Sequence, residues 1–462
     1  MNYDHLKKPL VLVIFGITGD LAQRKLLPAL YQLAKAGDLP EQLHIVGISR
    51  RDVSKDEVYA QLASFVAEPD YNRDIEQRLK DHSEMRQMDL LNEQAYHELL
   101  EHLQQLETAD EAGASRLYYL SIPSQAFTPI IRLLGATGHN APLSNGDAPR
   151  LLIEKPFGYD LTSAKELVYA LDEHFGEDQI YRIDHYVAKE TVQNILTFRF
   201  QNPLFESVWN NQHISKIEVV AREQLDIEGR ANFYEQTGAL RDLIQSHLLQ
   251  LLAITTMNRP DRQESEEIHI EKLRLLEDVR PIAPDMVDKK ALRGQYAGYR
   301  NEVNNQDSIT ETYARLELTI DNDRWRGVPI ILETGKALNE KRTAISVCFQ
   351  PSGSDEKNEL VFRIQPQEGI TLRLRTKQPG ITNVTEDADM DFDYTRSFNQ
   401  RPAEAYERVI VDAIRGDQTL FSSAAEVIRT WEIIETVLEH WLRNGEGLVF
   451  YQKGSSGPVD NS

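Results

Sequence analysis

An apolar run that meets small residues near the N-terminus constrains the fold of this chain more than any other segment. Residues 10–15 are apolar throughout, Gly16-Ile-Thr-Gly-Asp-Leu-Ala22 follows at once, and 21–36 has the apolar spacing of a helix that closes at Gly37. Small residues let a strand turn this sharply into a helix. The segment therefore predicts a strand over 11–15 and the first βα unit of a parallel sheet.

Strand-like and helix-like runs continue to alternate through the first third of the chain. A helix is predicted at 162–175, and further strands are predicted at 44–49, 117–122, 150–154 and 179–183. This alternation is typical of a parallel sheet with helices on both faces. We therefore expect a Rossmann-like α/β domain over residues 1–180.

The rest of the chain has strands in quick succession, flanked by long helices. Strands are predicted at 216–223, 311–320, 328–334, 344–350, 359–365 and 371–376, and helices at 237–256, 403–415 and 424–442. Massed strands predict a larger α+β domain with a mostly antiparallel or mixed sheet. We assign it residues 181–453, and expect 454–462 to be a loose, turn-rich tail.

Composition excludes several classes of partner. The 51 basic and 73 acidic residues give a net charge of −22, which disfavours nucleic acid and anionic membranes. The lone Cys348 excludes an internal disulfide framework, fits a reducing compartment and lies in a strand-like run, so we expect a buried thiol. No apolar stretch approaches the roughly 20 residues that cross a bilayer. We expect a cytoplasmic protein that binds neither nucleic acid nor membrane.

The turn after the first strand has the small residues of a phosphate-binding turn. In a dinucleotide fold, such residues permit the turn, close approach of the pyrophosphate and packing of the helix. The spacing is G-x-x-G-x-x-A, which alone is a weak signal, and a plain tight turn is the alternative. The residues expected to contact the cofactor here are Gly16, Thr18, Gly19, Asp20 and Leu21.

The end of the second predicted strand indicates which dinucleotide is bound. An NAD-specific site usually has an acid there, but this chain has Ser49-Arg50-Arg51. Guanidinium groups suit a 2′-phosphate, which arginine binds through parallel hydrogen bonds. We therefore expect NADP, held by Arg50, with some use of NAD because Asp52 follows.

The run Arg182-Ile-Asp-His-Tyr-Val-Ala-Lys-Glu190 concentrates polar side chains at a strand-to-helix junction, with a helix predicted at 188–200. His185, Tyr186 and Lys189 offer two potential cations and a hydroxyl, and the positive end of the helix dipole favours an anion there. A phosphate fits this combination. The alternative is a capped helix with a solvated basic end. Asp184 cannot favour the same anion and needs another role.

This run resembles the signature of the glucose-6-phosphate dehydrogenase family, RIDHYLGKE, with Val187 and Ala188 in place of Leu and Gly. The resemblance extends from about Val11 to the last helices and includes the family's GxxGDLA turn. It implies oxidation of D-glucose 6-phosphate at C1 to 6-phospho-D-glucono-1,5-lactone with hydride transfer to NADP, the first step of the oxidative pentose phosphate pathway. It also implies a homodimer or homotetramer, and it assigns His185, Tyr186 and Lys189 to the substrate phosphate.

The family pattern RDxxQNHxLQ matches Arg241–Gln250, with Ser246 in place of Asn. The resemblance implies that His247 is the general base for the C1 hydroxyl proton, and that the Asp184 carboxylate orients its imidazole. By its own pattern, a histidine on this apolar helical stripe is more often a satisfied core residue.

The resemblance also implies roles for residues that would otherwise be read as surface charges. Lys155 follows a parallel strand, where open α/β sheets bind ligands, and would bridge substrate and cofactor. Its E-K-P context also occurs in sugar oxidoreductases of the glucose–fructose oxidoreductase type. Tyr119 is assigned to the cofactor. The residues assigned to the substrate are Glu223, Asp242, Lys25, Lys336 and Lys341.

Departures from the family pattern surround these positions. Gln224-Leu-Asp226 replaces P-F-G, and Glu333 replaces an arginine that in animal enzymes belongs to a second, structural NADP site, so we expect no such site. The sequence shows no cluster of metal ligands. Three alternatives stay open: a paralogue for another aldose 6-phosphate, an oxidoreductase of an unphosphorylated sugar, and a catalytically silent NADP-binding regulatory partner.

Overall fold

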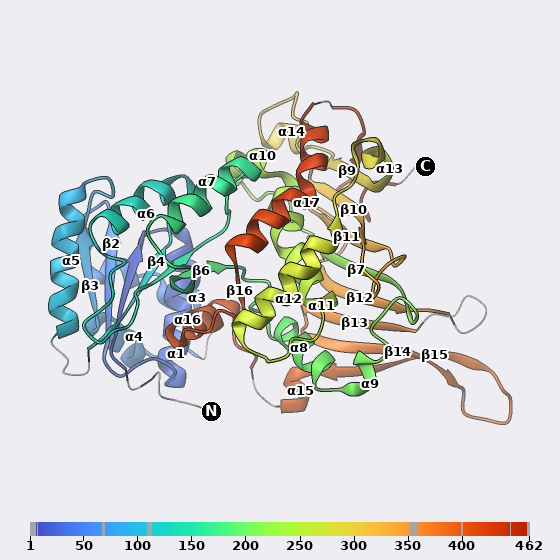
Figure 1. Cartoon of the computed structure of the whole chain (residues 1–462), viewed down its shortest axis with the longest axis horizontal. Coiled ribbons are helices and arrows are strands. Elements are labelled where there is room, and N and C mark those ends of the chain that lie inside the picture. The colour runs from blue at the N-terminus through green and yellow to red at the C-terminus, as the bar shows by residue number, and fades with distance from the viewer. Residues whose placement is uncertain are drawn as a thin grey trace. The chain divides into compact units, whose positions relative to one another are not determined.

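The computed structural model divides into two compact units, drawn in Figure 1. Unit 1 comprises the chain up to Gly158, Thr162–Ala188 and Ala403–Ala424. Unit 2 comprises Tyr159–Leu161, Lys189–Pro402 and the chain from Ala425. The structure describes residues 6, 8–66, 70–108, 113–351, 358–398, 401–443 and 445–459.

Unit 1 is built on a seven-stranded sheet that is parallel except at one edge, where β16 runs antiparallel to β6. The spatial order of its strands is β16 (Phe421–Ser422), β6 (Ile180–Ile183), β5 (Arg150–Ile153), β4 (Ser115–Leu120), β1 (Leu10–Phe15), β2 (Leu43–Ser49) and β3 (Ser83–Gln87). Every residue of β1 and β6 is buried, as expected for parallel strands covered on both faces.

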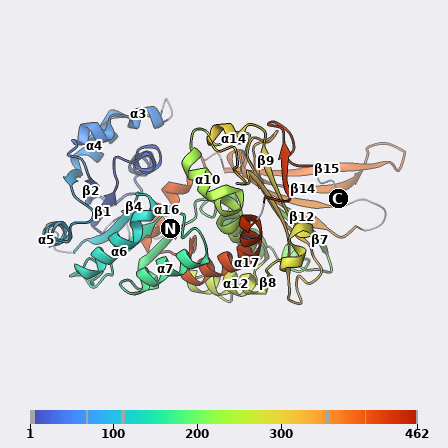
Figure 2. The same ribbon diagram turned by 90° about the horizontal axis from the view of Figure 1, so that it is seen from above.

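Helices cover both faces of this sheet, as Figure 2 shows. Contacts of α1 with α4 and α16 define one layer, and α5 and α6 pack together in another. The helical segments are η2 (Ala22–Leu26), α1 (Leu27–Ala36), α2 (Lys55–Tyr59), α3 (Leu62–Phe65), α4 (Arg73–Asp81), α5 (Glu93–Thr108), η3 (Ser124–Ala126), α6 (Phe127–Ala136), α7 (Leu161–Asp172), η4 (Glu177–Gln179) and α16 (Ala405–Arg415). The predicted Rossmann-like unit is confirmed.

One segment far along the chain returns to unit 1, which differs from the predicted division at residue 180. Residues 403–424 belong to unit 1 because β16 pairs with β6 and the Arg150 guanidinium donates to the Ala413 and Ile414 carbonyls, both at 2.8 Å. These carbonyls lie in the last turn of α16, where Arg150 supplies donors in addition to the Gly416 N–H, which the Ala413 carbonyl accepts at 3.3 Å. Local sequence pattern carries no information about such a return.

Unit 2 contains a ten-stranded mixed sheet, in which β7 and β11 are parallel neighbours. Its main order is β15 (Thr385–Asp393), β14 (Gly369–Lys377), β13 (Glu359–Gln365), β12 (Arg342–Phe349), β7 (Ile214–Arg222), β11 (Ile330–Gly335), β10 (Tyr313–Ile320), β9 (Ala291–Tyr296) and β17 (Leu448–Tyr451), with β8 (Val279–Arg280) beside β10. The predicted mixed sheet is confirmed, and Cys348 lies buried in β12, as expected.

The long helices of unit 2 lie on one face of its sheet, and η5 packs against β7, β10 and β11 (Figure 2). The helical segments are α8 (Glu190–Phe200), α9 (Pro203–Glu206), α10 (Ala231–Ala239), η5 (Leu240–Leu248), α11 (Leu249–Thr256), α12 (Ser265–Asp278), η6 (Pro284–Met286), α13 (Val287–Lys290), α14 (Tyr299–Glu302), α15 (Tyr394–Phe398) and α17 (Ala424–Arg443). Among the described residues, we find no helix with the length and apolar character to span a membrane.

Strand β15 was not predicted, because its sequence is mostly acidic and carries no apolar run. It is held by charge pairs across the ladder with β14. Arg373 donates to Asp389 at 3.0 Å and Arg375 donates to Asp387, also at 3.0 Å. Opposite charges on facing positions stabilise a strand pair that has little apolar surface to bury.

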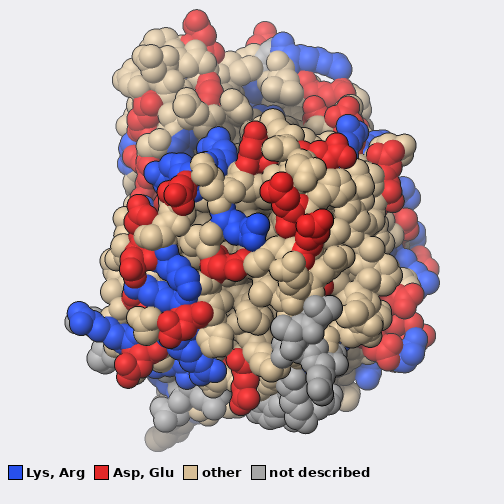
Figure 3. Space-filling model, turned by 90° about the vertical axis from the view of Figure 1, so that its left-hand side faces the viewer, with Lys and Arg blue, Asp and Glu red and all other residues tan. Residues whose placement is uncertain are grey.

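On the face of the molecule drawn in Figure 3, Lys and Arg side chains are interspersed with Asp and Glu.

The start of the predicted loose tail is fixed, in contrast to the prediction. The Gly454 N–H donates to the Ala337 carbonyl at 2.7 Å, and the Asn339 N–H donates to the Ser455 carbonyl at 2.8 Å. Turn-rich composition predicted disorder, but backbone hydrogen bonds to a distant loop order this part. The last three residues of the predicted tail, 460–462, lie outside the described residues.

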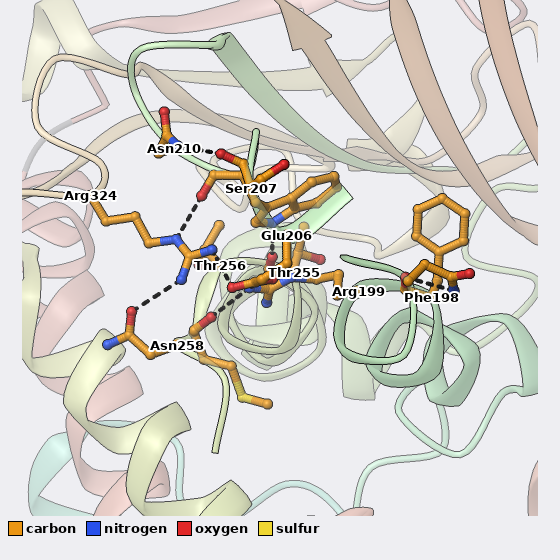
Figure 4. Close-up of polar contacts among 12 residues, drawn as sticks. Phe198, Arg199, Glu206, Ser207, Asn210, Thr255, Thr256, Asn258 and Arg324 are labelled. Carbon is orange, nitrogen blue, oxygen red and sulfur yellow. Dashed lines mark hydrogen bonds and ion pairs between the residues drawn. The ribbon is translucent and has the colours of Figure 1, made fainter. Parts of the chain in front are cut away.

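Helix α11 ends in the core of unit 2, where side chains bind its last carbonyl groups (Figure 4). The Arg199 guanidinium donates to the carbonyls of Ile254 at 3.2 Å and Met257 at 2.8 Å. Two tryptophans bind the carbonyls between them, with Trp209 on Thr255 and Trp325 on Thr256, both at 2.8 Å. Burial is possible here because each of these four carbonyl groups has a donor.

Replacing Arg199 with methionine should lower the stability of unit 2 by about 3 kcal/mol or more. The variant leaves two buried carbonyls without a donor, each costing roughly 1–3 kcal/mol. Thermal unfolding measures the effect. The control is Arg326→Met, which removes exposed ion pairs with Asp321 and Asp323 and should change stability by less than about 0.5 kcal/mol. Equal melting temperatures for the two variants would contradict the assigned role of Arg199.

Candidate functional site

The turn after β1 is shaped by two glycines. Gly16 has a φ of +80°, and a Cβ atom there would lie 2.3 Å from the Ser121 carbonyl oxygen. The Gly19 N–H donates to the Gly16 carbonyl at 2.8 Å, and Ala22 is fully buried. A larger residue at position 16 would clash with the backbone after β4. The turn therefore has the close backbone approach that the sequence predicted, at the carboxyl ends of parallel strands.

A pocket of ≈ 340 Å³ opens beside this turn, within unit 1. Its lining residues include an apolar wall and two arginines, and they are Thr18, Asp20, Gln23, Arg24, Arg51, Val53, Glu57, Val58, Gln61 and Phe65. An apolar wall suits an adenine ring, and guanidinium groups suit a phosphate. The residues present therefore fit the adenosine end of a dinucleotide.

The structure separates the two arginines after β2. Arg51 lines the pocket, whereas Arg50 is not among the described residues that line it. The Arg51 N–H donates to the Ser49 hydroxyl at 3.1 Å, which turns the chain after the strand. Arg24 also lines the pocket, with its guanidinium 2.6 Å from the Asp20 carboxylate and 5.8 Å from the centre of the Phe65 ring. Sequence reasoning missed Arg24, because an arginine on a helix has no distinguishing signal.

Glu154, at the carboxyl end of β5, is a buried carboxyl group between two tyrosines of unit 1. Its side chain accepts hydrogen bonds from the hydroxyls of Tyr119 and Tyr406. Burial raises the pKa of Glu154 to about 7, while the two tyrosine donors oppose that rise. Lys155, the next residue, precedes a cis peptide bond to Pro156. Tyr406 comes from the returning segment, so no local pattern could have predicted it here.

The Asp184–Lys189 junction is a turn between β6 and α8. The Tyr186 N–H donates to the Asp184 carboxylate at 3.0 Å, which fixes the first part of the turn. The half-buried His185 ring lies parallel to the Tyr406 ring, with centres 6.3 Å apart and an interplanar angle of 16°. The buried Tyr186 ring lies 4.9 Å from that of His185. The structure thus brings Asp184, His185 and Tyr186 together in unit 1.

The amino-terminal end of α8 differs from the predicted anion site in one respect. The Thr191 N–H in the first turn donates to the Glu368 carboxylate at 2.8 Å. Burial raises the pKa of Glu368, and the Thr191 N–H and the charge of Lys189 oppose that rise. One N–H group of the helix terminus is therefore already bonded to a carboxylate of the protein itself. A phosphate at this junction would depend on side chains more than on the helix dipole.

His247 is buried in η5, a helix with π-type hydrogen bonding where a plain helix was predicted. Its start is set by Gly238, which has a φ of +65° and whose Cβ would lie 2.5 Å from a Glu311 carboxylate oxygen. Glu311 accepts the Leu240 N–H at 2.9 Å, and burial raises its pKa. Wide helical turns are frequent at functional sites.

Polar side chains also fix η5 and α11 against α12 and α17. Gln245 donates to the Thr430 hydroxyl at 3.0 Å, and Gln250 donates to the Glu426 carboxylate at 2.9 Å. Lys272 pairs with the same carboxylate at 2.8 Å, and both side chains are almost fully buried. The two glutamines stand on either side of His247 in the sequence. The helix that presents the predicted base is thus held at several points.

The predicted substrate-binding residues Glu223 and Lys336 pair with each other after the parallel strands β7 and β11. The Lys336 ammonium lies 5.2 Å from the centre of the Tyr234 ring, and its side chain is almost fully buried. The Glu223 N–H donates to the Gly335 carbonyl at 2.9 Å. The two residues therefore lie next to each other on segments that a backbone hydrogen bond joins, as expected if both bind the same ligand.

The departures from the family pattern form their own charge pairs. Arg222 pairs with Glu333 at 2.7 Å and with Glu340 at 2.6 Å. These carboxylates keep the Arg222 guanidinium fully protonated, because they raise its pKa against the effect of burial. Glu333 therefore has a partner within unit 2 and is a poor ligand for a second dinucleotide phosphate. Lys453 pairs with Asp226 at 2.7 Å.

Three further residues predicted to bind the substrate are not part of the pairs described above. Lys25 in η2 and Lys341 before β12 are exposed, and Asp242 lies in η5. Unit 1 holds Lys155 and Asp184 to Tyr186, whereas unit 2 holds Lys189, Glu223, Asp242, His247 and Lys336. The expected pairing of Asp184 with His247 stays a prediction.

The buried Glu154 predicts a pH dependence of stability that its amide variant should lack. A carboxyl group whose folded pKa rises from 4.5 to about 7 stabilises the folded state below pH 4.5, and this contribution is lost as the pH rises through 7. Glu154→Gln should therefore gain stability relative to wild type between pH 5 and 8, by up to roughly 3 kcal/mol. Thermal unfolding of both proteins at each pH measures this. A constant difference across the range would show that Glu154 titrates normally.

Comparison with known proteins gives a single result for both units. Residues 13–194 match the family model described as "Glucose-6-phosphate dehydrogenase, NAD binding domain", and residues 196–462 match "Glucose-6-phosphate dehydrogenase, C-terminal domain". The glucose-6-phosphate 1-dehydrogenase of Chlamydia muridarum is 40% identical over 97% of this chain and 94% of its own length. That of Bacillus subtilis is 38% identical over 98% of this chain and 95% of its own length.

Solved structures agree. A glucose-6-phosphate dehydrogenase in complex with its substrate glucose-6-phosphate has a TM-score of 0.90 and 33% identity, covering 98% of this chain and 96% of its own. The enzyme from Mycobacterium avium has a TM-score of 0.84 and 31% identity, covering 98% of this chain and 95% of its own. Levoglucosan dehydrogenase, at 10% identity and a TM-score of 0.54, shares the fold alone. Because two family models and relatives about 40% identical span it, this chain belongs to the glucose-6-phosphate dehydrogenase family of oxidoreductases.

Proposed function

We propose that this chain oxidises D-glucose 6-phosphate at C1 to 6-phospho-D-glucono-1,5-lactone, with NADP as the hydride acceptor. The observation that carries the proposal is the Asp184–Lys189 turn, which keeps every polar residue of the family signature in a chain whose two halves match the family models. The solved relative in complex with glucose-6-phosphate supports the choice of substrate. The reaction would serve the first step of the oxidative pentose phosphate pathway.

His247 is the proposed general base. Oxidation removes a hydride from C1 and a proton from its hydroxyl, and a neutral imidazole takes that proton near neutral pH. The bound nicotinamide ring supplies the hydride acceptor. The anchored η5–α11 helix supports the assignment, because a base must be held within hydrogen-bond reach of one atom. Asp184 is proposed to hold the imidazole in the correct tautomer and to stabilise its protonated form.

The proposed phosphate ligands are His185, Tyr186 and Lys189, and Lys25 is a further proposed substrate-binding lysine, with Lys341 as a supplementary basic residue. The proposed ligands of the sugar hydroxyls are Glu223 and Asp242. Lys336 is proposed to bind the same substrate, and Lys155 to contact both substrate and cofactor. The pairing of Lys336 with Glu223 supports a common substrate site, because it places a cation beside a carboxylate that can accept hydrogen bonds from sugar hydroxyls.

The pocket beside the Gly16 turn is the proposed site of the adenosine 2′-phosphate. Arg51 and Arg24 line it together with Thr18, which supports NADP over NAD. Gly19 and Leu21 belong to the same turn, and Tyr119 is proposed to contact the cofactor beyond it. Asp20 pairs with Arg24, so a phosphate would compete with that carboxylate. This competition leaves room for NAD as a second cofactor.

Some properties of the protein are proposed from the family and from composition. We propose a homodimer or homotetramer that acts in the cytoplasm and binds neither nucleic acid nor membrane. The net charge of −22 supports the absence of polyanionic partners, since long-range repulsion would oppose their approach. Size-exclusion chromatography with light scattering tests the oligomeric state.

The function is tested by measuring NADPH formation with a panel of sugars. Glucose 6-phosphate should give the highest kcat/KM, above other aldose 6-phosphates and far above free glucose. A higher value for another aldose 6-phosphate would favour the paralogue, and equal use of free glucose would favour an oxidoreductase of unphosphorylated sugars. Binding of NADP without turnover of any sugar would favour the regulatory partner.

Replacing His247 with asparagine should lower kcat by at least about 10²-fold, the usual scale of general-base catalysis, with little change in KM. Asp184→Asn should have a smaller effect, because the base survives in a poorer orientation. Steady-state kinetics measure both variants. The control is His213→Asn, which changes an exposed histidine and should leave kcat unchanged. A near-normal kcat for the His247 variant would end the assignment.

Replacing Arg51 with alanine should raise KM for NADP much more than KM for NAD, because only NADP carries the 2′-phosphate. Loss of a charge-assisted hydrogen bond costs roughly 1.5–3 kcal/mol, which corresponds to about a tenfold or larger change. Arg50→Ala is the matched control, and we expect a smaller effect because Arg51 lines the pocket. The reverse order of effects would place the 2′-phosphate beside Arg50, as the sequence alone predicted.

A further inference from the structure

Residues 451–455 pack against the loop that carries Lys336. Strand β17 runs parallel to β9, and the residues after it continue to this loop, where Leu338 and Ser455 form an isolated bridge. Residues 451–455 are called the C-terminal strap below. Sequence composition predicted a loose tail at this point, so the contacts need a physical reason.

The loop beyond Lys336 has an unfavourable backbone conformation. Ala337 has a φ of +53°, in the left-handed region that alanine rarely adopts. This conformation costs roughly 1–2 kcal/mol and persists only where surrounding contacts hold it. On one side, the Lys336 N–H donates to Thr312 and the Ala337 N–H donates to Leu225, both at 2.9 Å. The carbonyl groups of the same two residues face the strap.

Hydrogen bonds from the strap hold the other side of this loop. The Tyr451 hydroxyl donates to the Lys336 carbonyl at 2.7 Å, and it is buried. The Gly454 N–H donates to the Ala337 carbonyl at 2.7 Å, and the Ser455 carbonyl accepts the Asn339 N–H at 2.8 Å. Three consecutive contacts thus fix the backbone on both sides of the left-handed residue. The backbone position anchors the Lys336 side chain, whose ammonium group pairs with Glu223.

Charge pairs hold the strap in place. The Lys453 ammonium lies 2.7 Å from the Asp226 carboxylate and 2.6 Å from that of Glu302, and 4.8 Å from the centre of the Tyr296 ring. Asp226 belongs to the segment where this chain departs from the family's P-F-G. The departure therefore gives the strap a partner that glycine could not provide.

We propose that the C-terminal strap positions Lys336 for the substrate, with Tyr451 as the central positioning residue. This inference rests on the proposed function, in which Lys336 binds glucose 6-phosphate. The strap holds the left-handed turn, the turn sets the position of Lys336, and Lys336 remains beside Glu223. Tyr451 has no contact with the reacting atoms in this role and acts only through the loop.

The test is the full-length Tyr451→Phe variant, which keeps the ring and removes the hydroxyl. KM for glucose 6-phosphate should rise about threefold to tenfold, because the variant removes the hydrogen bond to the Lys336 carbonyl together with the contacts of the same hydroxyl with the Thr312 hydroxyl at 2.8 Å and the Thr312 carbonyl at 3.2 Å. KM for NADP should be unchanged, and kcat should stay within about twofold. Tyr299→Phe is the matched control, because Tyr299 lies in the same tyrosine cluster and donates to Glu235 at 2.8 Å without contacting Lys336. Its KM should equal that of wild type.

A double-mutant cycle with Lys336→Ala separates positioning from general stability. If Tyr451 acts through Lys336, its substitution should raise KM in the wild-type background and have no further effect in the Lys336→Ala background. Independent, multiplicative effects, or a KM for Tyr451→Phe equal to that of the control, would overturn the inference and leave the proposed function intact. A normal KM for Lys336→Ala would overturn the inference and the role of Lys336 together. Failure of wild type to oxidise glucose 6-phosphate would instead refute the proposed function itself.

Discussion

Burial of the η5–α11 helix depends on polar partners for its backbone ends, and much of unit 2 is arranged around that requirement. Every residue of α11 is buried, so water cannot satisfy its terminal groups. Glu311 accepts an N–H at the start of η5, and Arg199, Trp209 and Trp325 donate to carbonyls at the end of α11. Leaving a buried polar group unpaired costs more folding free energy than a formed hydrogen bond contributes. These partners therefore decide whether the helix can lie in the core of unit 2.

A helix fixed at both ends gives its side chains defined positions. His247 lies between Gln245 and Gln250, whose amides bind Thr430 and the buried Glu426. Lys272 offsets the Glu426 charge, which lowers the pKa of that carboxyl group to about 2 despite its burial. The group therefore remains ionised and holds its partners over the whole neutral range. Structural polarity of this kind holds in place the helix that carries His247, the proposed base.

The sequence allowed prediction of elements defined by local apolar patterns, such as β1 with its glycine turn, the parallel strands of unit 1 and β13. Other features depend on distant residues. Strand β15 is stabilised by arginines of β14, the 403–424 segment by β6 and Arg150, and the start of η5 by Glu311. Family resemblance identified candidate ligands by position. It could not show that Arg51 lines the pocket, because the direction of a side chain after a strand depends on the turn that follows.

Cations at several candidate positions already have carboxylate partners, which bears on how an acidic protein selects an anion. Lys336 pairs with Glu223, and Arg24 pairs with Asp20. In the first turn of α8, the Thr191 N–H likewise has a carboxylate partner, Glu368. The Lys336 side chain is almost fully buried, so a ligand that displaced Glu223 from it would have to bring a negative charge, because the cation would otherwise be left desolvated and unpaired. A phosphate monoester, with up to two charges and three acceptor oxygens, can do this. A neutral sugar cannot, because its hydroxyls would leave the ammonium or guanidinium uncompensated. At the buried Lys336, pairing with Glu223 therefore favours a ligand that brings a negative charge of its own, whereas at the exposed Arg24–Asp20 pair the carboxylate competes with a phosphate.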